Sequence, residues 1–292
     1  MGKAAFVALI GRPSVGKSTL TNTLCKEKVA IVSAIPQTTR NAIRGIVNRP
    51  EGQLVFIDSP GRHQSEKKFN KRLREVSNRT VESSDICLYM LDATRLPGIE
   101  EEAVVSYISK VERLVLAINK IDSPEAQCPH LLNFIREKFP SVPEQYYCQI
   151  SALTGEGIAV LLQRLFDYAP EGEAFYPSEY YTDQKLDFRI AEIIREKAIE
   201  QLYAEIPYSL YAEVADAELS GNRLWVRAFL VTERESQKAM VVGKGGAVIK
   251  IIRLNAQKEL NRLLDWKVTL DLRVKTVKDW RHRDSTLKKL IW

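Results

Sequence analysis

The chain has 292 residues, of which 45% are apolar and 27% are charged. This length predicts two domains rather than one small module, and this composition excludes wholesale disorder and fibrous architectures. The formal net charge of +6 suits a polyanionic partner, either nucleic acid or an anionic membrane surface, and does not choose between them.

The excess positive charge lies at the end of the chain. Residues 1–184 carry 22 basic and 22 acidic side chains, and residues 185–237 carry 7 basic and 10 acidic ones. Residues 238–292 carry 14 basic and 5 acidic side chains, a net charge of +9. Such a segment is either a surface that faces a polyanion or an ordinary solvated face, and charge alone favours neither.

The first 170 residues alternate short apolar runs with helical patterns, which is typical of βαβ units and a mostly parallel sheet. We expect strands at residues 5–10, 54–57, 86–91, 114–118 and 146–150. Because their apolar residues are consecutive, these strands suit the centre of a sheet that helices cover on both faces. The sequence therefore predicts an α/β domain over residues 1–170.

A phosphate-binding motif follows the first of these strands. Residues 11–18, GRPSVGKS, fit the pattern GxxxxGK[ST] between a strand and a helix. Glycines let the backbone wrap around phosphate oxygens, Lys17 is expected to reach the β- and γ-phosphates, and the Ser18 hydroxyl to ligate Mg²⁺. The residues of this loop that we expect to contact a nucleotide are Gly11, Arg12, Pro13, Ser14, Val15, Gly16, Lys17, Ser18 and Thr19.

Two segments after this loop complete the predicted phosphate and Mg²⁺ site. Asp58, at the end of a strand, is expected to hold Mg²⁺ through water, and the Gly61 N–H to bond the γ-phosphate. One threonine of residues 36–40, PQTTR, is expected to complete the Mg²⁺ shell, and we favour Thr39 over Thr38. The predicted metal ligands are Ser18, Thr39 and Asp58, and the predicted catalytic residues are Lys17, Thr39 and Gly61.

Two further motifs predict which base is bound. Asp122 of the segment NKID can accept hydrogen bonds from the N1 and N2 donors of guanine, and adenine lacks that donor pair. The segment SAL at residues 151–153 is expected to supply a backbone contact to the guanine O6. The predicted nucleotide contacts beyond the phosphate loop are Asp58, Ser59, Pro60, Gly61, Arg62, Asn119, Lys120, Ile121, Asp122, Ser151, Ala152 and Leu153.

The remaining residues predict a linker and a second domain. Residues 171–184 contain acidic residues and a proline but no basic residue, and we interpret them as a linker. Residues 185–292 predict an α+β domain, with a helix at 187–203, strands at 210–217 and 223–232, a glycine-centred break at 243–246, a helix at 247–264 and a strand at 267–275.

The glycine-centred break has the form GxxG, from Gly243 to Gly246, between a short apolar turn and an amphipathic helix. Such a loop lets a nucleic-acid backbone approach closely, although a glycine-rich helix start has the same pattern. The order of elements matches a KH domain of the second topological type, and the loop opens the segment of net charge +9, so we favour RNA as the partner. The predicted RNA contacts in and after the loop are Gly243, Lys244, Gly245, Gly246, Lys250 and Arg253.

The motifs GRPSVGKS, QTTR, DSPG, NKID and SAL, followed by VVGKGG, resemble the Era family of ribosome-associated GTPases over essentially the whole chain. The resemblance implies a switch that hydrolyses GTP with Mg²⁺ and binds the 3′ region of 16S ribosomal RNA to assist maturation of the small (30S) subunit. It also implies a cytoplasmic protein with peripheral association with the inner membrane, and we expect a monomer. The basic C-terminal end resembles the family too, which adds Arg281 and Arg283 to the predicted RNA contacts.

Two positions depart from the family pattern. Ser14 stands where the family usually has the asparagine associated with potassium-assisted hydrolysis, and Arg62 stands where it usually has a bulky apolar residue. Arg62 cannot orient a water as the glutamine of other GTPases does, so no general base is assigned. We interpret His63 and Gln64 as surface residues of a loop.

Two alternative functions stay open at this point. In one, the nucleotide merely stabilises an RNA-binding conformation of a non-enzymatic assembly factor. In the other, the protein binds a membrane surface through its basic tail. The four cysteines show no zinc-ligand spacing, which predicts reduced thiols in a cytosolic protein.

Overall fold

The structure, a computed structural model, describes residues 2–33, 35, 38–60 and 68–291, with only the backbone of residues 68 and 289. The chain forms two compact units. The first comprises residues 1–30, 36–183 and 291–292, and the second comprises residues 31–35 and 184–290.

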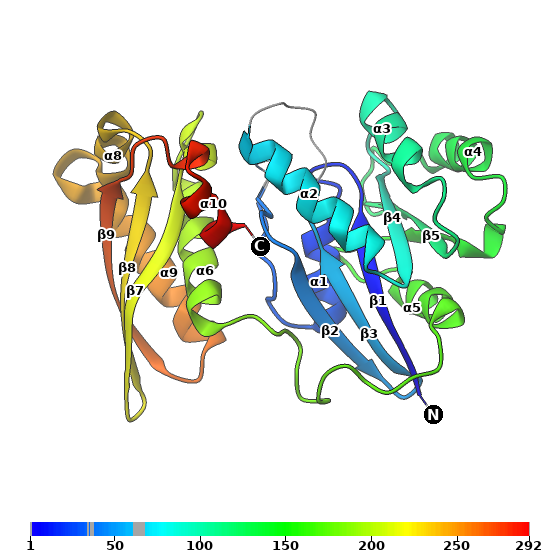
Figure 1. Ribbon diagram of the computed structural model, residues 1–292, viewed down its shortest axis with the longest axis horizontal. Helices are drawn as coiled ribbons and strands as arrows, with labels where there is room; N and C mark the ends of the chain where they lie inside the picture. Colours follow the sequence, from blue (N-terminus) through cyan, green and yellow to red (C-terminus); the bar gives the residue numbers. More distant parts are fainter. Residues whose placement is uncertain (1, 34, 36–37, 61–67, 292) are drawn as a thin grey trace. The chain divides into compact units, whose positions relative to one another are not determined.

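The first unit is built on a six-stranded sheet with the strand order β2-β3-β1-β4-β5-β6 (Figure 1). Its strands are β1 (Lys3–Ile10), β2 (Ile43–Arg49), β3 (Gly52–Asp58), β4 (Ile86–Asp92), β5 (Leu114–Asn119) and β6 (Tyr147–Ile150). All neighbours pair in parallel except β2 and β3, which are antiparallel. The five predicted strands are confirmed. The edge strand β2 was missed because Arg44 and Gly45 interrupt its apolar run.

Helices cover both faces of this sheet, as the consecutive apolar runs predict. They are α1 (Lys17–Cys25), α2 (Lys68–Glu82), α3 (Ile99–Ile108), α4 (Cys128–Lys138) and α5 (Ile158–Tyr168), with a short 3₁₀ turn at Glu144–Tyr146. Leu9 of β1 belongs to a buried cluster with α1 and α5, whereas its neighbours Ala8 and Ile10 belong to a second cluster with α3 and α4. The strand ends are thereby fixed between two apolar layers.

The segment interpreted as a linker packs along the first unit. The Ile46 N–H of β2 donates to the Tyr181 carbonyl at 2.9 Å, and the Phe175 ring stacks on Phe6 with centroids 4.3 Å apart. The Gln53 side chain bonds the Tyr176 backbone at both its amide atoms. These contacts attach the chain as far as residue 183 to the sheet.

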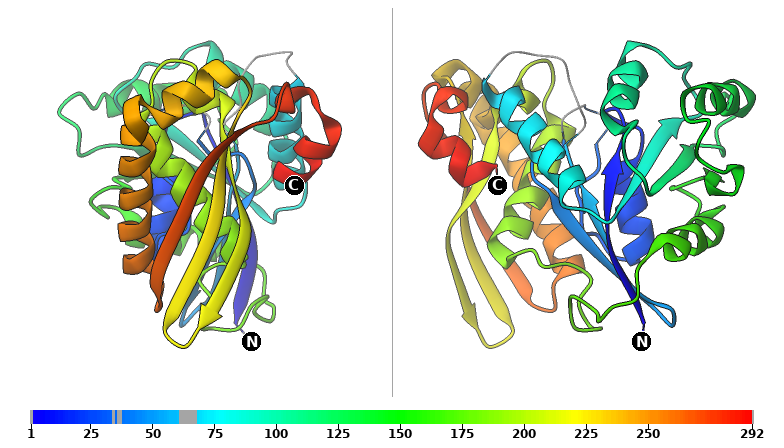
Figure 2. Two further views of the ribbon diagram at one scale, coloured as in Figure 1. Left: turned by 90° about the vertical axis from the view of Figure 1, so that its left-hand side faces the viewer. Right: turned by 45° about the vertical axis from the view of Figure 1, so that its right-hand side comes forward.

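The second unit is an α+β fold with a three-stranded sheet of order β7-β8-β9. Its elements are α6 (Leu186–Gln201), α7 (Ile206–Ser209), β7 (Tyr211–Ser220), β8 (Arg223–Thr232), α8 (Glu235–Val242), a 3₁₀ turn at Lys244–Gly246, α9 (Ala247–Leu263), β9 (Lys267–Thr276), a 3₁₀ turn at Trp280–His282 and α10 (Asp284–Leu290). β7 and β8 are antiparallel and β8 and β9 parallel. α6 and α9 lie side by side on one face of the sheet (Figure 2).

Three helices of this unit were not predicted. α7 has only four residues, too few to show a periodic apolar pattern. α8 occupies the place of the expected apolar turn, because its apolar residues Met240, Val241 and Val242 lie only at its end. α10 lies in the expected basic tail. Between β9 and α10, the buried Trp280 donates from its indole nitrogen to the Ser209 carbonyl at 3.0 Å, which ties the C-terminal segment to the domain core.

Candidate functional site

Polar motifs follow four strands of the first sheet at one of its edges. β1 leads into the phosphate loop, β3 ends at Asp58, β5 ends at Asn119 and β6 precedes Ser151. The parallel register pairs Leu9 with Asp58 and Asn119 with Ile150, so these ends are level. Open α/β sheets bind ligands at this carboxyl edge.

The phosphate loop depends on glycine at its close approaches. Gly16 has φ +103°, and a side chain there would collide with the amide of Asn119. α1 begins at the next residue, Lys17, and the Leu20 N–H donates to the Gly16 carbonyl at 2.8 Å. The first N–H groups of α1 thus point at the loop, where they and the helix dipole favour an anion.

Lys17 is held inside the loop. Its Nζ donates to the carbonyls of Gly11 and Arg12, each at 3.0 Å, and the residue is 7% exposed. Burial lowers the pKa of Lys17 to about 8, although the charge of Asp58 opposes this shift. A bound phosphate would supply the negative charge that this buried ammonium lacks.

Three oxygens form a candidate Mg²⁺ site. The Ser18 hydroxyl donates to Oδ2 of Asp58 at 2.5 Å and lies 3.0 Å from the Thr39 hydroxyl. The other carboxylate oxygen of Asp58 is buried and has no hydrogen-bond partner among the described residues, and burial raises the pKa of Asp58. Hydroxyl and carboxylate oxygens with an unsatisfied buried acceptor fit a hard cation whose remaining ligands come from water and phosphates.

Asn119 joins the phosphate loop to the SAL segment. Its amide nitrogen donates to the Val15 carbonyl at 2.8 Å, and its oxygen accepts the Ala152 N–H at 2.8 Å. The Ser151 N–H donates to the Glu156 carbonyl at 3.0 Å. Two of the three SAL amides are thus engaged, which leaves the amide of the exposed Leu153 available to a ligand.

Asp122 lies at the open side of this region. It is exposed, and among the described residues its carboxylate accepts no hydrogen bond, in contrast to Asp58 and Asn119. Lys120, two residues earlier, has φ +69°, which turns the chain directly after β5. A free carboxylate at a chain reversal is available to a ligand.

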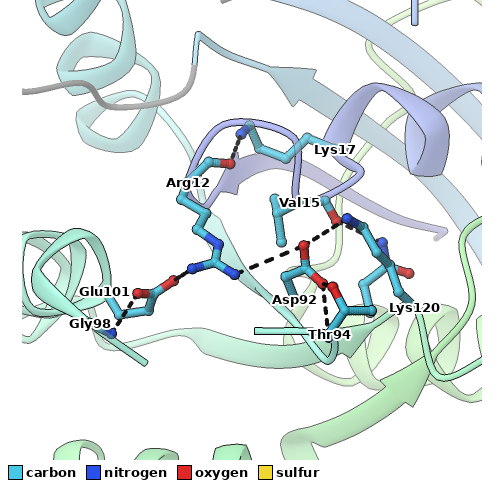
Figure 3. Close-up of polar contacts among 9 residues, drawn as sticks. Arg12, Val15, Lys17, Asp92, Thr94, Gly98, Glu101 and Lys120 are labelled. Carbon is cyan, nitrogen blue, oxygen red and sulfur yellow. Dashed lines mark hydrogen bonds and ion pairs between the residues drawn. The ribbon is translucent and has the colours of Figure 1, made fainter. Parts of the chain in front are cut away.

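Other predicted residues contribute differently or lie outside the described residues. Arg12 is buried, and its guanidinium contacts Glu101 and Asp92 (Figure 3). The buried Ser59 hydroxyl donates to the Leu9 carbonyl at 3.2 Å, inside the sheet layer. Pro13, Thr19 and Ile121 are half-buried, and Ser14 is exposed; Pro36, Gln37, Gly61, Arg62, His63 and Gln64 are outside the described residues.

Asp92 and Glu101, which belong to none of the predicted motifs, contact the phosphate loop through Arg12. Asp92 is the last residue of β4, and Glu101 lies in the first turn of α3. The available signal was position: Asp92 ends an apolar strand as Asp58 and Asn119 do, but it belongs to no recognised motif.

The GxxG loop of the second unit presents charge to solvent. Gly243, Gly245 and Gly246 have φ values of +74°, +60° and +79°. A side chain at Gly243 would collide with Val248, whereas one at Gly245 or Gly246 would meet open space. Lys244 and Lys250 are exposed, as is Arg283, and Arg253 is half-buried. Arg281 donates from Nε to the buried Glu233 carboxylate at 3.0 Å, so it also anchors the C-terminal segment.

Two family models match separate parts of the chain. A family described as 50S ribosome-binding GTPase matches residues 6–120, and a KH domain family matches residues 205–281. GTPase Era of Treponema denticola is 50% identical over 290 residues, 98% of this chain and 99% of that protein. GTPase Era of Borreliella burgdorferi is 41% identical over 291 residues, 99% of each.

Two solved structures match the whole chain. One is Aquifex aeolicus Era bound to GDP and AlF4⁻, with 33% identity, coverage of 98% of both chains and a TM-score of 0.92. The other is Era in complex with MgGDPNP and nucleotides 1506–1542 of 16S ribosomal RNA, with 33% identity, coverage of 99% and 98%, and a TM-score of 0.93.

Proposed function

The chain belongs to the GTPase Era family, and on that premise we propose that it is a GTP-hydrolysing switch that binds the 3′ region of 16S ribosomal RNA and assists maturation of the small subunit. The observation that carries this proposal is the gathering of Lys17, Asp58 and Asn119 at one sheet edge, in a chain whose second unit presents an exposed GxxG loop.

Hydrolysis in this site depends on positioning and electrostatics. Lys17 and the N–H groups at the start of α1 hold the phosphates, and Lys17 meets the charge that develops on them. Ser18, Thr39 and Asp58 would hold Mg²⁺. When bound, Mg²⁺ would neutralise negative charge on the phosphates. Gly61 is proposed to donate its N–H to the γ-phosphate.

Guanine selection is proposed to rest on two groups. The Asp122 carboxylate accepts the N1 and N2 donors, and the Leu153 N–H donates to O6. Adenine would present a mismatched edge and leave both groups without partners, which costs affinity. We expect GTP to bind at least about a hundredfold more tightly than ATP, and a competition assay with a fluorescent GDP measures this ratio.

RNA binding is proposed for the GxxG loop and the start of α9. The open space over Gly245 and Gly246 admits a sugar–phosphate backbone, and the exposed Lys244 and Lys250 supply phosphate contacts. The small subunit is favoured because one solved relative that matches nearly the whole chain is in complex with nucleotides of 16S ribosomal RNA. The family description that mentions the 50S subunit covers only residues 6–120.

We further propose a cytoplasmic monomer with peripheral association with the inner membrane, in which the basic C-terminal segment contacts anionic lipid. Among the described residues, no helix is long and apolar enough to cross a bilayer. Association through the basic segment would depend on charge, and salt should release it.

Crosslinking in cells tests the proposed partner. The wild-type protein should recover the 3′ end of 16S ribosomal RNA, and the Gly245→Asp variant should not, because it places a carboxylate where the RNA backbone approaches. Vesicles with anionic lipid should bind both proteins equally. Recovery of no ribosomal RNA by the wild type would falsify the proposed partner.

A further inference from the structure

Asp92 ends β4 at the carboxyl edge that carries the nucleotide motifs, although it belongs to none of them. In the sheet, β4 lies between β1 and β5. β1 leads into the phosphate loop, and β5 ends at Asn119, directly before Lys120. A side chain at the end of β4 therefore lies between the two loops that hold opposite ends of a nucleotide.

Asp92 contacts a cation from each of these loops (Figure 3). Its Oδ2 lies 2.6 Å from Nζ of Lys120 and 3.9 Å from Nη2 of Arg12. Its Oδ1 accepts the N–H and the hydroxyl of Thr94, at 3.0 and 2.7 Å. Burial alone raises the pKa of Asp92, but the hydrogen bonds from Lys120 and Thr94 lower it below its ordinary value, so the carboxylate is ionised.

Arg12 is fixed from a second side by α3. Its Nη1 lies 2.9 Å from Oε1 of Glu101, and each side chain is 6% exposed. The other oxygen of Glu101 accepts the Gly98 N–H at 2.9 Å, at the start of α3. Because the Arg12 carbonyl accepts a hydrogen bond from Lys17, the placement of Arg12 bears directly on the phosphate-binding lysine.

Fold stability alone does not call for this arrangement. Buried ion pairs are costly to desolvate, and apolar residues of similar volume often stabilise a fold as well or better. What a shared carboxylate adds is a fixed distance between the groups that it holds. Here those groups belong to the phosphate loop and to the base-recognition segment.

We propose that Asp92 is a positioning residue for the guanine nucleotide: by holding Arg12 and Lys120 together, it fixes the phosphate loop relative to the base-recognition segment. Glu101 supports it by fixing Arg12. The inference rests on the proposed binding of GDP and GTP. A nucleotide spans both loops, so loosening their spacing weakens its binding. Asp92 contacts neither Lys17 nor the oxygens of Ser18, Thr39 and Asp58 directly. A bound triphosphate would itself hold Lys17 in place, so we expect the hydrolytic step in the bound complex to be retained.

The test compares Asp92→Asn with Asp85→Asn. Asp85 precedes the same strand at its other end, is exposed and accepts the Phe6 N–H at 2.8 Å. We expect Asp92→Asn to raise the Kd for fluorescent GDP and the KM for GTP at least tenfold, with kcat within threefold of wild type. Asp85→Asn should stay within twofold on all three. Equal Kd values for the two variants, or a loss of kcat at unchanged KM, would overturn the inference.

A second pair keeps the inference testable if Asp92→Asn fails to fold, which circular dichroism shows. Glu101→Gln should raise the Kd at least threefold, whereas Glu102→Gln, on the exposed Glu102 that pairs with Lys138, should not. Equal Kd values for this pair would also overturn it.

A double-mutant cycle tests the route through Lys120. The combined effect of Asp92→Asn and Lys120→Met on Kd should be smaller than the product of the single effects, because the two residues share one contact. If the effects of the two substitutions on Kd are independent, the inference is contradicted and the proposed function is unaffected. A wild-type protein that binds no GDP removes the proposed function, and the inference with it.

Discussion

The phosphate loop and the GxxG loop are both glycine-rich turns that lead into a helix, yet they present charge in opposite ways. Gly16 precedes α1 with φ +103°, and Gly246 precedes α9 with φ +79°. Lys17 of the first loop is buried and donates to carbonyls of its own loop, whereas Lys244 of the second is exposed.

This difference follows from the size of the proposed ligands. A nucleotide can be surrounded, so its site can use buried charges whose pKa values and contacts are set before it binds. A nucleic acid meets a surface, so its site must leave cations and bare backbone in solvent. Substitutions in the first site should therefore have large effects on binding and catalysis. Substitutions in the second site should each have a smaller effect on RNA binding, which depends on the contact that is lost.

The largest effect is expected for Lys17→Ala. The substitution removes the buried ammonium that meets charge on the transferred phosphate, so GTP turnover should fall at least about a hundredfold. Steady-state phosphate release measures it. As a control, binding of a 16S 3′-end oligonucleotide in the absence of nucleotide should equal that of the wild type. GTP turnover equal to that of the wild type would contradict the assigned role of Lys17.

Two glycines of the GxxG loop should respond differently. Gly245→Asp meets open space, and aspartate is one of the residues that adopt the left-handed φ of +60° found there, so the variant should keep the folded state. It should weaken RNA binding at least about tenfold through like-charge repulsion. Gly243→Ala collides with Val248 and should lower the melting temperature of the second unit. Oligonucleotide titration and thermal melting separate the two, and a Gly245→Asp variant that binds RNA normally contradicts the proposed surface.

The two units should respond separately to GDP. The cysteines all lie in the first unit, and Trp225, Trp266 and Trp280 lie in the second. Burial raises the pKa of Cys25 and of Cys87 to about 12, from 9.0, so at pH 8 their thiolate fraction is about a thousandfold lower than in the unfolded chain. Thiol labelling in urea therefore reports unfolding of the first unit.

GDP at a hundred times its Kd should raise the free energy of unfolding by about 2.7 kcal/mol in the thiol-detected transition. The tryptophan-detected transition should stay in place. The experiment uses a protein that carries Cys128→Ser and Trp292→Phe. The first substitution removes a half-buried thiol, and the second removes the tryptophan that belongs to the first unit. Equal shifts of both transitions would show that the units unfold together.

The smallest effects are expected for single surface cations. Lys250→Ala should weaken RNA binding a few-fold and reduce the slope of log K against log salt by about one, because one phosphate contact is lost. Lys267→Ala removes an exposed lysine beyond the other end of α9 and serves as the control. A slope that is the same for both variants contradicts a phosphate contact at Lys250.

The sequence predicted the strands and motifs of the first unit well because their signals are local. The apolar run of β4 predicts a buried strand by itself, and GRPSVGKS specifies its own loop. β2 and α8 were not predicted because their own apolar patterns are weak. β2 is instead held in place by β3 and by the segment around Tyr181, and α8 has its large apolar residues only at its end. Thr39 lies beside Ser18 as the favoured role requires, but that role stays a prediction.

The contacts of Arg12 could not be predicted from local sequence patterns, because its partners are distant in the sequence. A motif indicates that Arg12 belongs to a phosphate loop, but its partners Asp92 and Glu101 are 80 or more positions away along the chain. Only the strand order, which places β4 between β1 and β5, brings them together.

The central claim, that this chain hydrolyses GTP and couples hydrolysis to RNA, is tested most directly by single-turnover release of the γ-phosphate, with and without the 16S 3′-end oligonucleotide. The account predicts phosphate release by the wild type in both conditions, at a rate that RNA changes, and loss of release in Lys17→Ala. RNA binding with no phosphate release under either condition would contradict it and leave the nucleotide a purely structural role.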